Sequence, residues 1–249
     1  MNPSAHGSRA ATVLAWLVLA SCLMVPRPVH AQASTPPSAA SKNLAPGFSA
    51  LSSKDPVLLM PVDVELFSLS AGGVAEPKAD WTAAAQKHMA AAITQKQAQL
   101  KLASQQMSET DADAFAEQVS LHAAVAGSIA LHHAVGGPWQ LPTKAGMLDW
   151  SFGDAMQPLR DKTGARYALF VWVRDSYASP ERKAAMVALA LLGVGITGGI
   201  QVGYASLVDL DSGRVVWFNR LARGTGDLRE AGPAKESIDA LLTGFPAAQ

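Results

Sequence analysis

The feature that most constrains this chain is a long run without charged residues, AAMVALALLGVGITGGIQVGYASLV, at residues 184–208. Such a run is expected to be a membrane span, a nucleotide-binding glycine loop or part of a folded interior. Ser179 is a good helix N-cap, Pro180 suits the first helical position, and Gly193 suits a left-handed stop. The predicted helix over 180–192 is about 20 Å long, whereas a bilayer core is ~30 Å thick. We therefore predict a short helix, a glycine turn and a strand.

The glycines of this run also spell G-x-G-x-x-G at Gly193, Gly195 and Gly198. A dinucleotide site needs a strand before this motif and a helix after it, so that the helix N-terminus faces the pyrophosphate. Here the predicted order is reversed. Asp209 and Asp211 also follow too early for a ribose contact, which usually lies about 20 residues on. The sequence predicts no nucleotide cofactor.

The predicted helix over 180–192 carries apolar residues on every face. A helix of this kind is either enclosed in its own domain or docked on another subunit or a membrane surface. We take Leu189 and Leu192 as its buried or interface residues, with Ser179, Pro180 and Gly193 defining its ends.

The N-terminus predicts export. Arg9 precedes an apolar run at residues 10–25, and PRPVHA follows with small residues before a cleavage point after Ala31. Cys22, in LASC, resembles the lipobox of bacterial lipoproteins, in which cleavage precedes an acylated cysteine. Residues 1–31 are thus a signal peptide, cleaved either before Cys22 or after Ala31. Both alternatives place the protein in the periplasm, and the first anchors it to the outer membrane through a lipid.

Beyond the signal peptide we predict two segments. Residues 32–53 are rich in Ser, Ala and Pro and are expected to form a flexible linker, and residues 54–246 a single α/β domain. The predicted fold is an α+β sandwich with one mixed β-sheet covered by helices. Its elements are a strand at 55–66, helices at 80–107 and 108–135, a short helix around Pro158, a strand at 165–177, a hairpin at 202–221 and a closing helix at 232–245.

Composition excludes several classes of protein. Lys plus Arg and Asp plus Glu are 20 each, and no basic stripe is present, so nucleic acid is not an expected partner. Hydrophobic residues make up 49% of the chain and charged residues 16%, which supports a packed core. The only cysteine is Cys22, so the predicted domain contains no disulfide.

No catalytic constellation, metal site or cofactor site is predicted. His122 and His133 share a helix face but stand about 16 Å apart, too far for one metal ion, and are expected to be solvated or capping residues. No G-x-S-x-G nucleophile motif is present. Arg174 and Asp175 end a strand and are predicted to form a surface ion pair. Four tryptophans are expected to pack the core or pin loops: Trp139, Trp150, Trp172 and Trp217.

Three stretches occur in order: VLLMPVDVELFSLSAGG followed by ADWTAAA, then LRDKTGARYALFVWVRD, then YASLVDLDSGRVVWFN. Together with the closing LLTGFP, they resemble proteobacterial exported envelope proteins and lipoproteins related to the TolB amino-terminal domain and the curli-secretion channel proteins. The resemblance implies an α/β sandwich that binds other envelope proteins rather than turning over a substrate. It transfers no catalytic residue to this chain.

We therefore expect a non-enzymatic binding or assembly module in the periplasm or at the outer membrane. Its partners are other envelope proteins, not identified by the sequence, and self-association is left open. The alternative is an oligomeric outer-membrane secretion or pore subunit that uses residues 184–208. The helices over 80–134 and the insertion at 180–199 are not obvious in the channel proteins.

Overall fold

The computed structural model describes residues 41–247. The predicted signal peptide, Cys22 and the first part of the predicted linker lie outside the described residues. The described chain forms the predicted α+β sandwich, in which a single mixed sheet of seven strands is covered by helices on both faces.

The sheet is organised around one long strand, β5. Its strands are β1 (Val57–Leu59), β2 (Asp63–Leu69), β3 (Ala75–Pro77), β4 (Ser104–Gln106), β5 (Tyr167–Ala178), β6 (Gln201–Asp209) and β7 (Val215–Arg223). On one edge β5 pairs in parallel with β1 and then with β2, and on the other it pairs antiparallel with β6. β7 completes a hairpin with β6, while β3 and β4 extend the sheet beyond β2 and β1.

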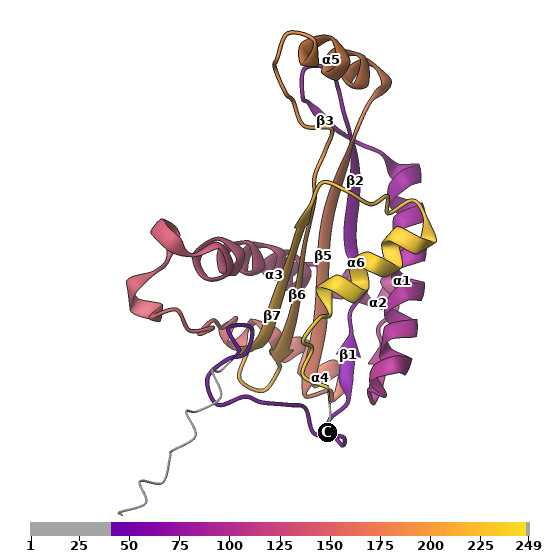
Figure 1. The fold of residues 1–249 in the computed structure, drawn as a ribbon. Helices are drawn as coiled ribbons and strands as arrows, with labels where there is room; N and C mark the ends of the chain where they lie inside the picture. Colours follow the sequence, from indigo (N-terminus) through magenta and orange to yellow (C-terminus); the bar gives the residue numbers. More distant parts are fainter. Residues whose placement is uncertain (1–40, 248–249) are drawn as a thin grey trace, which may run out of the picture. The chain divides into compact units, whose positions relative to one another are not determined.

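Helices cover the two faces of this sheet, as Figure 1 shows. The helices are α1 (Ala79–Leu100), α2 (Glu109–Ala112), α3 (Ala116–Ile129), α4 (Gln157–Thr163), α5 (Pro180–Ala190) and α6 (Ala231–Leu241). A π-helical turn, η2 (Ala130–Val135), prolongs α3, and short 3₁₀ turns are η1 (Asp113–Phe115), η3 (Gly137–Trp139), η4 (Pro142–Lys144) and η5 (Gly153–Met156). α1 and α6 pack on one face, and α3 packs on the other.

Side chains of β5 point alternately to the two faces of the sheet and contribute to the hydrophobic core on each face. Leu169, Val171 and Val173 point toward α1 and α6, whereas Ala168 and Phe170 point toward α3. Successive residues of a strand face opposite sides of a sheet, so a strand covered on both faces reads as one continuous apolar run. The sequence YALFVWV is such a run.

Two predicted elements differ from the structure. The single strand predicted at 55–66 is divided into β1 and β2 at Pro61, and the two parts pair with different stretches of β5. The helix predicted to reach residue 107 ends at Leu100, because Lys101 takes a left-handed conformation with φ 51°. The residues beyond it add β4 beside β1, since tertiary pairing outweighs the helix propensity of an Ala- and Gln-rich sequence.

The predicted linker at 32–53 is also wrong in its second half, because residues 41–53 are part of the folded domain. Leu44 forms a β-bridge with Trp217, and the amide of Phe218 donates to the carbonyl of Asn43 at 2.9 Å. Ala45 is 2% exposed and Leu51 5%. This segment covers the first half of the outer edge of β7, and an edge strand gains stability from such pairing.

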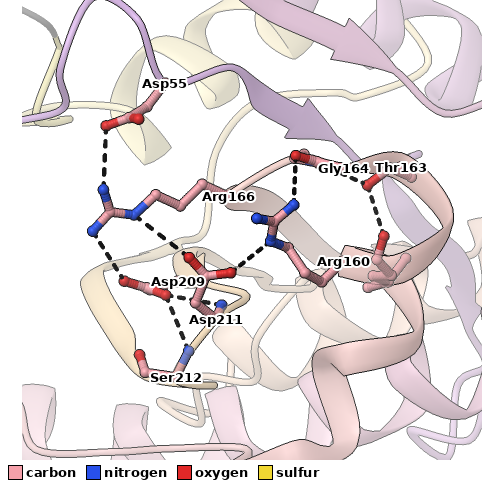
Figure 2. Close-up of polar contacts among 10 residues, drawn as sticks. Asp55, Arg160, Thr163, Gly164, Arg166, Asp209, Asp211 and Ser212 are labelled. Atoms are coloured by element: carbon pink, nitrogen blue, oxygen red, sulfur yellow. Dashed lines mark hydrogen bonds and ion pairs between the residues drawn. The ribbon is translucent and has the colours of Figure 1, made fainter.

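The far end of the β6–β7 hairpin is fixed by charged side chains (Figure 2). Arg166 lies 3.7 Å from Asp55, 4.0 Å from Asp209 and 3.9 Å from Asp211, and Arg160 also pairs with Asp211. Two of the stretches that carry the family resemblance, LRDKTGARY and VDLDSGRVVW, therefore meet at this network. Its role is to hold the hairpin turn against α4 and the start of β1.

Candidate functional site: an apolar arm and the cleft at its base

The sheet ends in a projecting segment, residues 180–200, which we call the arm (Figure 1). It consists of α5 and the loop that returns to β6. Ser179 is the N-cap of α5, its hydroxyl accepts a hydrogen bond from the amide of Arg182 at 3.2 Å, and Pro180 is the first helical residue. Gly193 has φ 76° just beyond the helix, and the amide of Val194 donates to the carbonyl of Leu189. The helix thus begins and ends at the signals present in the sequence.

The arm exposes its apolar side chains. Leu191 is 84% exposed, Leu192 78% and Val187 65%. Leu189 is half-buried, and Arg182 is the buried residue of α5. Enclosure of this helix within its own domain, one of the two alternatives for residues 180–192, is therefore excluded, and docking on something outside the domain remains.

The C-terminal part of the uncharged run lies in a different environment from the arm. Residues 201–208 form most of β6, which pairs with β5 on one edge and with β7 on the other. Ala205, Leu207 and Val208 are fully buried. The run thus divides into an exposed arm and a buried central strand. Its composition is similar in both parts, but its environment differs.

Polar contacts attach the arm to the sheet. The buried guanidinium of Arg182 donates to the carbonyl of Thr197 at 2.9 Å and to the carbonyl of Ser70 at 3.3 Å. The amide of Ser179 donates to the carbonyl of Leu69 at 2.9 Å. One side chain therefore ties α5, the returning loop and the β2–β3 turn together, so that the arm is held in one position.

Arg182→Ala is expected to loosen the arm without unfolding the domain. It removes hydrogen bonds from a charged donor, each of which contributes about 1.5–3 kcal/mol to local stability. Amide hydrogen exchange across residues 180–200 should become faster, while exchange in β5 and β6 stays unchanged. Lys183→Ala, at the exposed neighbouring position, is the control and should leave exchange in the arm as it is.

A cleft of about 930 Å³ opens at the base of the arm. It is bounded by the carboxyl ends of β2 and β5, by the loop that follows β7 and by the first turns of α5. We call the part of its lining formed by Trp81, Asp175, Tyr177, Gln201 and Arg229 the floor of the cleft.

Asp175 is the buried acid of this cleft, at 3% exposure. Tyr177 donates its hydroxyl to Asp175 at 2.5 Å, and the side-chain amide of Gln201 donates to the same carboxylate at 2.8 Å. Burial raises the pKa of Asp175, and burial together with the adjacent carboxylate raises the pKa of Tyr177. On its other side Gln201 accepts from Arg223 at 2.8 Å and from Ser237 at 2.9 Å. The network therefore joins β5, β6, β7 and α6.

The predicted surface ion pair between Arg174 and Asp175 is wrong. Arg174 pairs with Asp63 at 2.7 Å and with Glu65 at 3.3 Å, both on β2. Asp175 faces the other side of the sheet, because neighbouring residues of a strand point in opposite directions. The two side chains therefore belong to separate networks.

Arg229 closes one side of the cleft. Its guanidinium lies 4.4 Å from the ring centre of Trp81 and 4.5 Å from that of Tyr177, and it pairs with Asp227 at 2.6 Å. Every charged group on this floor thus has a partner. The arrangement is suited to holding the arm rigid and presenting a shaped surface. Within residues 41–247, no three His, Cys, Asp or Glu side chains are grouped so that they could hold a metal ion.

The histidines divide into two kinds. His122 is 2% exposed, stacks on Phe170 with ring centres 4.8 Å apart, and shares a hydrogen bond with the Ser206 hydroxyl at 2.9 Å. The prediction that His122 is solvated or capping is therefore wrong, because its face of α3 packs on the sheet. His132 and His133 do hydrogen-bond to backbone carbonyls, those of Trp139 and Lys42, both at 2.7 Å.

Three of the four tryptophans pack against neighbouring aromatic side chains, as predicted. Trp217 is fully buried against Phe245, Trp172 stacks on Tyr204 at 5.0 Å, and Trp150 stacks on His132 at 6.4 Å. Trp139 is 58% exposed, so neither core packing nor loop pinning accounts for it.

No protein-family model matches the sequence, and no curated protein matches it. Among solved structures, the chain is similar to the PelC dodecamer from Paraburkholderia phytofirmans, with TM-score 0.39 and 15% identity over 80% of this chain and 93% of that chain. It is also similar to lipoprotein GNA1162 from Neisseria meningitidis, with TM-score 0.30 and 11% identity over 76% of this chain and 94% of that chain. It is also similar to the LpoB C-terminal domain from Salmonella enterica, with TM-score 0.27 and 13% identity over 72% of this chain and 87% of that chain. At these TM-scores the similarities assign no function, and the resemblance to the TolB and curli-channel families stays a prediction.

Proposed function

We propose that this chain is an exported, non-enzymatic binding module of the cell envelope that docks another envelope protein through the arm. The observation that carries the proposal is the exposure of Leu191 and Leu192, at 84% and 78%, on a segment with a fixed position. Export to the periplasm rests on the predicted signal peptide at residues 1–31. The alternative cleavage before Cys22 would add anchorage to the outer membrane.

The physical argument is that exposed apolar groups gain most when a partner covers them. Contiguous apolar surface rimmed by polar residues marks interaction sites on soluble domains. Burying it contributes about 25 cal/mol per Å² removed from water. The contacts of Arg182 and the network around Asp175 fix the arm in advance, which reduces the conformational entropy lost on binding.

The alternative of a pore formed by residues 184–208 is less consistent with the fold. Residues 201–208 are the central strand between β5 and β7, and inserting them in lipid would break both pairings. Backbone groups left unpaired in a bilayer cost several kcal/mol each. Within residues 184–208, the exposed part is residues 184–200, which belong to the arm.

In-cell photo-crosslinking tests the proposal. A photoreactive amino acid at Leu191 should yield a discrete crosslinked species with a protein of the envelope fraction, and the same group at Lys87 on α1 should not. Absence of a Leu191 adduct in growing cells, or recovery of the uncleaved protein from the cytoplasm, would contradict the proposal.

The variant Leu191→Ser with Leu192→Ser is expected to abolish that crosslink, measured with the photoreactive group moved to Val187, while the melting temperature of the purified protein stays within about 2 °C. The reason is that substitutions at exposed positions usually change stability by less than ~0.5 kcal/mol. Leu192→Asp should act in the same way. Leu189→Asp is different, because it places a charge at a half-buried position and should lower the melting temperature.

A further inference from the structure

A second group of apolar side chains lies exposed outside the arm. Leu131 is 41% exposed, Val135 54%, Trp139 58% and Met147 48%. All four belong to the segment that follows α3, between η2 and the turn after η4, and we call them the Trp139 patch. In Figure 1 this segment projects sideways from the sheet on the side of α3, whereas the arm projects from the top of the sheet.

The described chain begins beside this patch. His133, which lies between Leu131 and Val135 in sequence, donates its Nε2 proton to the carbonyl of Lys42 at 2.7 Å. The described chain therefore begins next to the patch. If Cys22 carries the lipid, the 18 residues from 23 to 40 separate it from the domain, which is at most about 60 Å of extended chain.

The charged residues around the Trp139 patch are compatible with contact between this patch and a lipid bilayer surface. Residues 118–143 contain no Asp, Glu, Lys or Arg. Asp149 is paired with Lys144 at 3.4 Å, and Lys42 stands where the described chain begins. Anionic headgroups would meet lysines and uncharged groups rather than free carboxylates. Trp139 also suits this location, because an indole favours the boundary between apolar and polar phases.

The size of the patch argues against a second copy as its occupant. Four roughly half-exposed side chains offer on the order of 400 Å², whereas each partner of a stable protein interface contributes ~800 Å². A weak contact is sufficient for a domain that a tether already keeps at a membrane, since tethering supplies a high effective concentration.

We propose that the Trp139 patch seats the domain on a lipid bilayer surface and leaves the arm, which projects from a different part of the sheet, free to contact its partner. This proposal rests on the proposed function in one respect, which is that the protein must reach the cell envelope. The TolB and curli-channel resemblance plays no part in it. The helical run Glu109–Val135, which is apolar and long enough to cross a membrane by length and composition, covers a sheet face instead and ends at this patch.

The test uses the full chain carrying Cys22→Ser, so that no lipid is attached, purified after export. Flotation with vesicles of phosphatidylethanolamine and phosphatidylglycerol measures partition. The variant Val135→Ser with Trp139→Ser should lower partition by about ten-fold or more, because it removes two of the four apolar contacts. The matched control, Leu191→Ser with Leu192→Ser at the arm, should change it less than about two-fold.

A second measurement locates Trp139 itself. Brominated lipids should quench part of the tryptophan fluorescence, and Trp139→Phe should remove that quenching while partition persists. Failure of the Cys22→Ser protein to float, or equal partition of the patch variant, would overturn the proposal. A patch variant that changes the sedimentation coefficient without vesicles and leaves partition unchanged would assign the patch to self-association instead. Normal flotation of a protein whose Leu191 gives no crosslink in cells would refute the proposed function alone.

Discussion

Acid is expected to destabilise this protein through His122, with the free energy of unfolding falling by roughly 2–3 kcal/mol between pH 7 and pH 4.5 and further toward pH 3. Burial lowers the pKa of His122 from 6.5 to about 3. The unfolded chain therefore takes up a proton near pH 6.5, and the folded chain does so only near pH 3. The contribution of the neutral histidine is fully present above pH 6.5 and is lost as the pH falls through this window.

Urea unfolding at a series of pH values from 7 to 4.5 measures the effect. His122→Gln can still share a hydrogen bond with Ser206 and does not titrate, so its stability should fall less steeply with acid than that of the natural protein. His88→Gln, on α1, is the matched control and should retain the steep dependence. Parallel curves for the natural protein and His122→Gln would show that the acid sensitivity comes from other groups.

Much of the fold is predictable because its strongest elements carry local signals. β5 is a continuous apolar run between two polar segments, and the β6–β7 hairpin turns at Asp211, Ser212 and Gly213 as its sequence indicates. Ser179 and Gly193 mark the ends of α5 in the same way. In these places local propensity and tertiary environment agree.

The elements that were mispredicted carry no such signal. β4 is the polar triplet SQQ, and the segment around Leu44 lies in a Ser-, Ala- and Pro-rich context. Each becomes part of the sheet because β1 or β7 presents an unpaired edge, which is a property of the assembled fold rather than of the short segment.

The cleft network was missed for a related reason. Asp175, Gln201, Arg223 and Ser237 are far apart in sequence, and only the pairing of β5 with β6 and β7 brings them together. One signal was available in β5. Asp175 is in phase with Val171 and Val173, the buried positions, so an acid there predicts a buried polar contact rather than a surface ion pair.

The exposure of the arm was not predictable from composition. Residues 184–200 and 201–208 are similarly apolar, yet the first group is exposed and the second is a central strand. What distinguishes them is the glycine-rich join between the arm and β6. Its last glycine, Gly199, passes directly against β5.

Gly199→Ala is expected to break this join, with a loss of roughly 3–5 kcal/mol in the free energy of unfolding. Gly199 has φ 144°, a conformation that side-chain-bearing residues rarely adopt, and an added Cβ would lie 1.9 Å from the carbonyl oxygen of Ser176. Either the loop or the end of β5 must shift, which would weaken the hydrogen bond from the amide of Ser176 to the carbonyl of Ile200 at 3.2 Å.

Thermal melting together with amide hydrogen exchange across 180–200 measures both consequences, loss of global stability and release of the arm. Gly195→Ala is the matched control from the same glycine-rich loop, because an added Cβ there meets no atom within 4 Å. It should leave melting, exchange and the Leu191 crosslink unchanged. If Gly199→Ala behaves like Gly195→Ala in all three measurements, the arm does not depend on the close approach of Gly199 to Ser176, and its position is set by its other contacts, those of Arg182 and of the Ser179 amide with the Leu69 carbonyl.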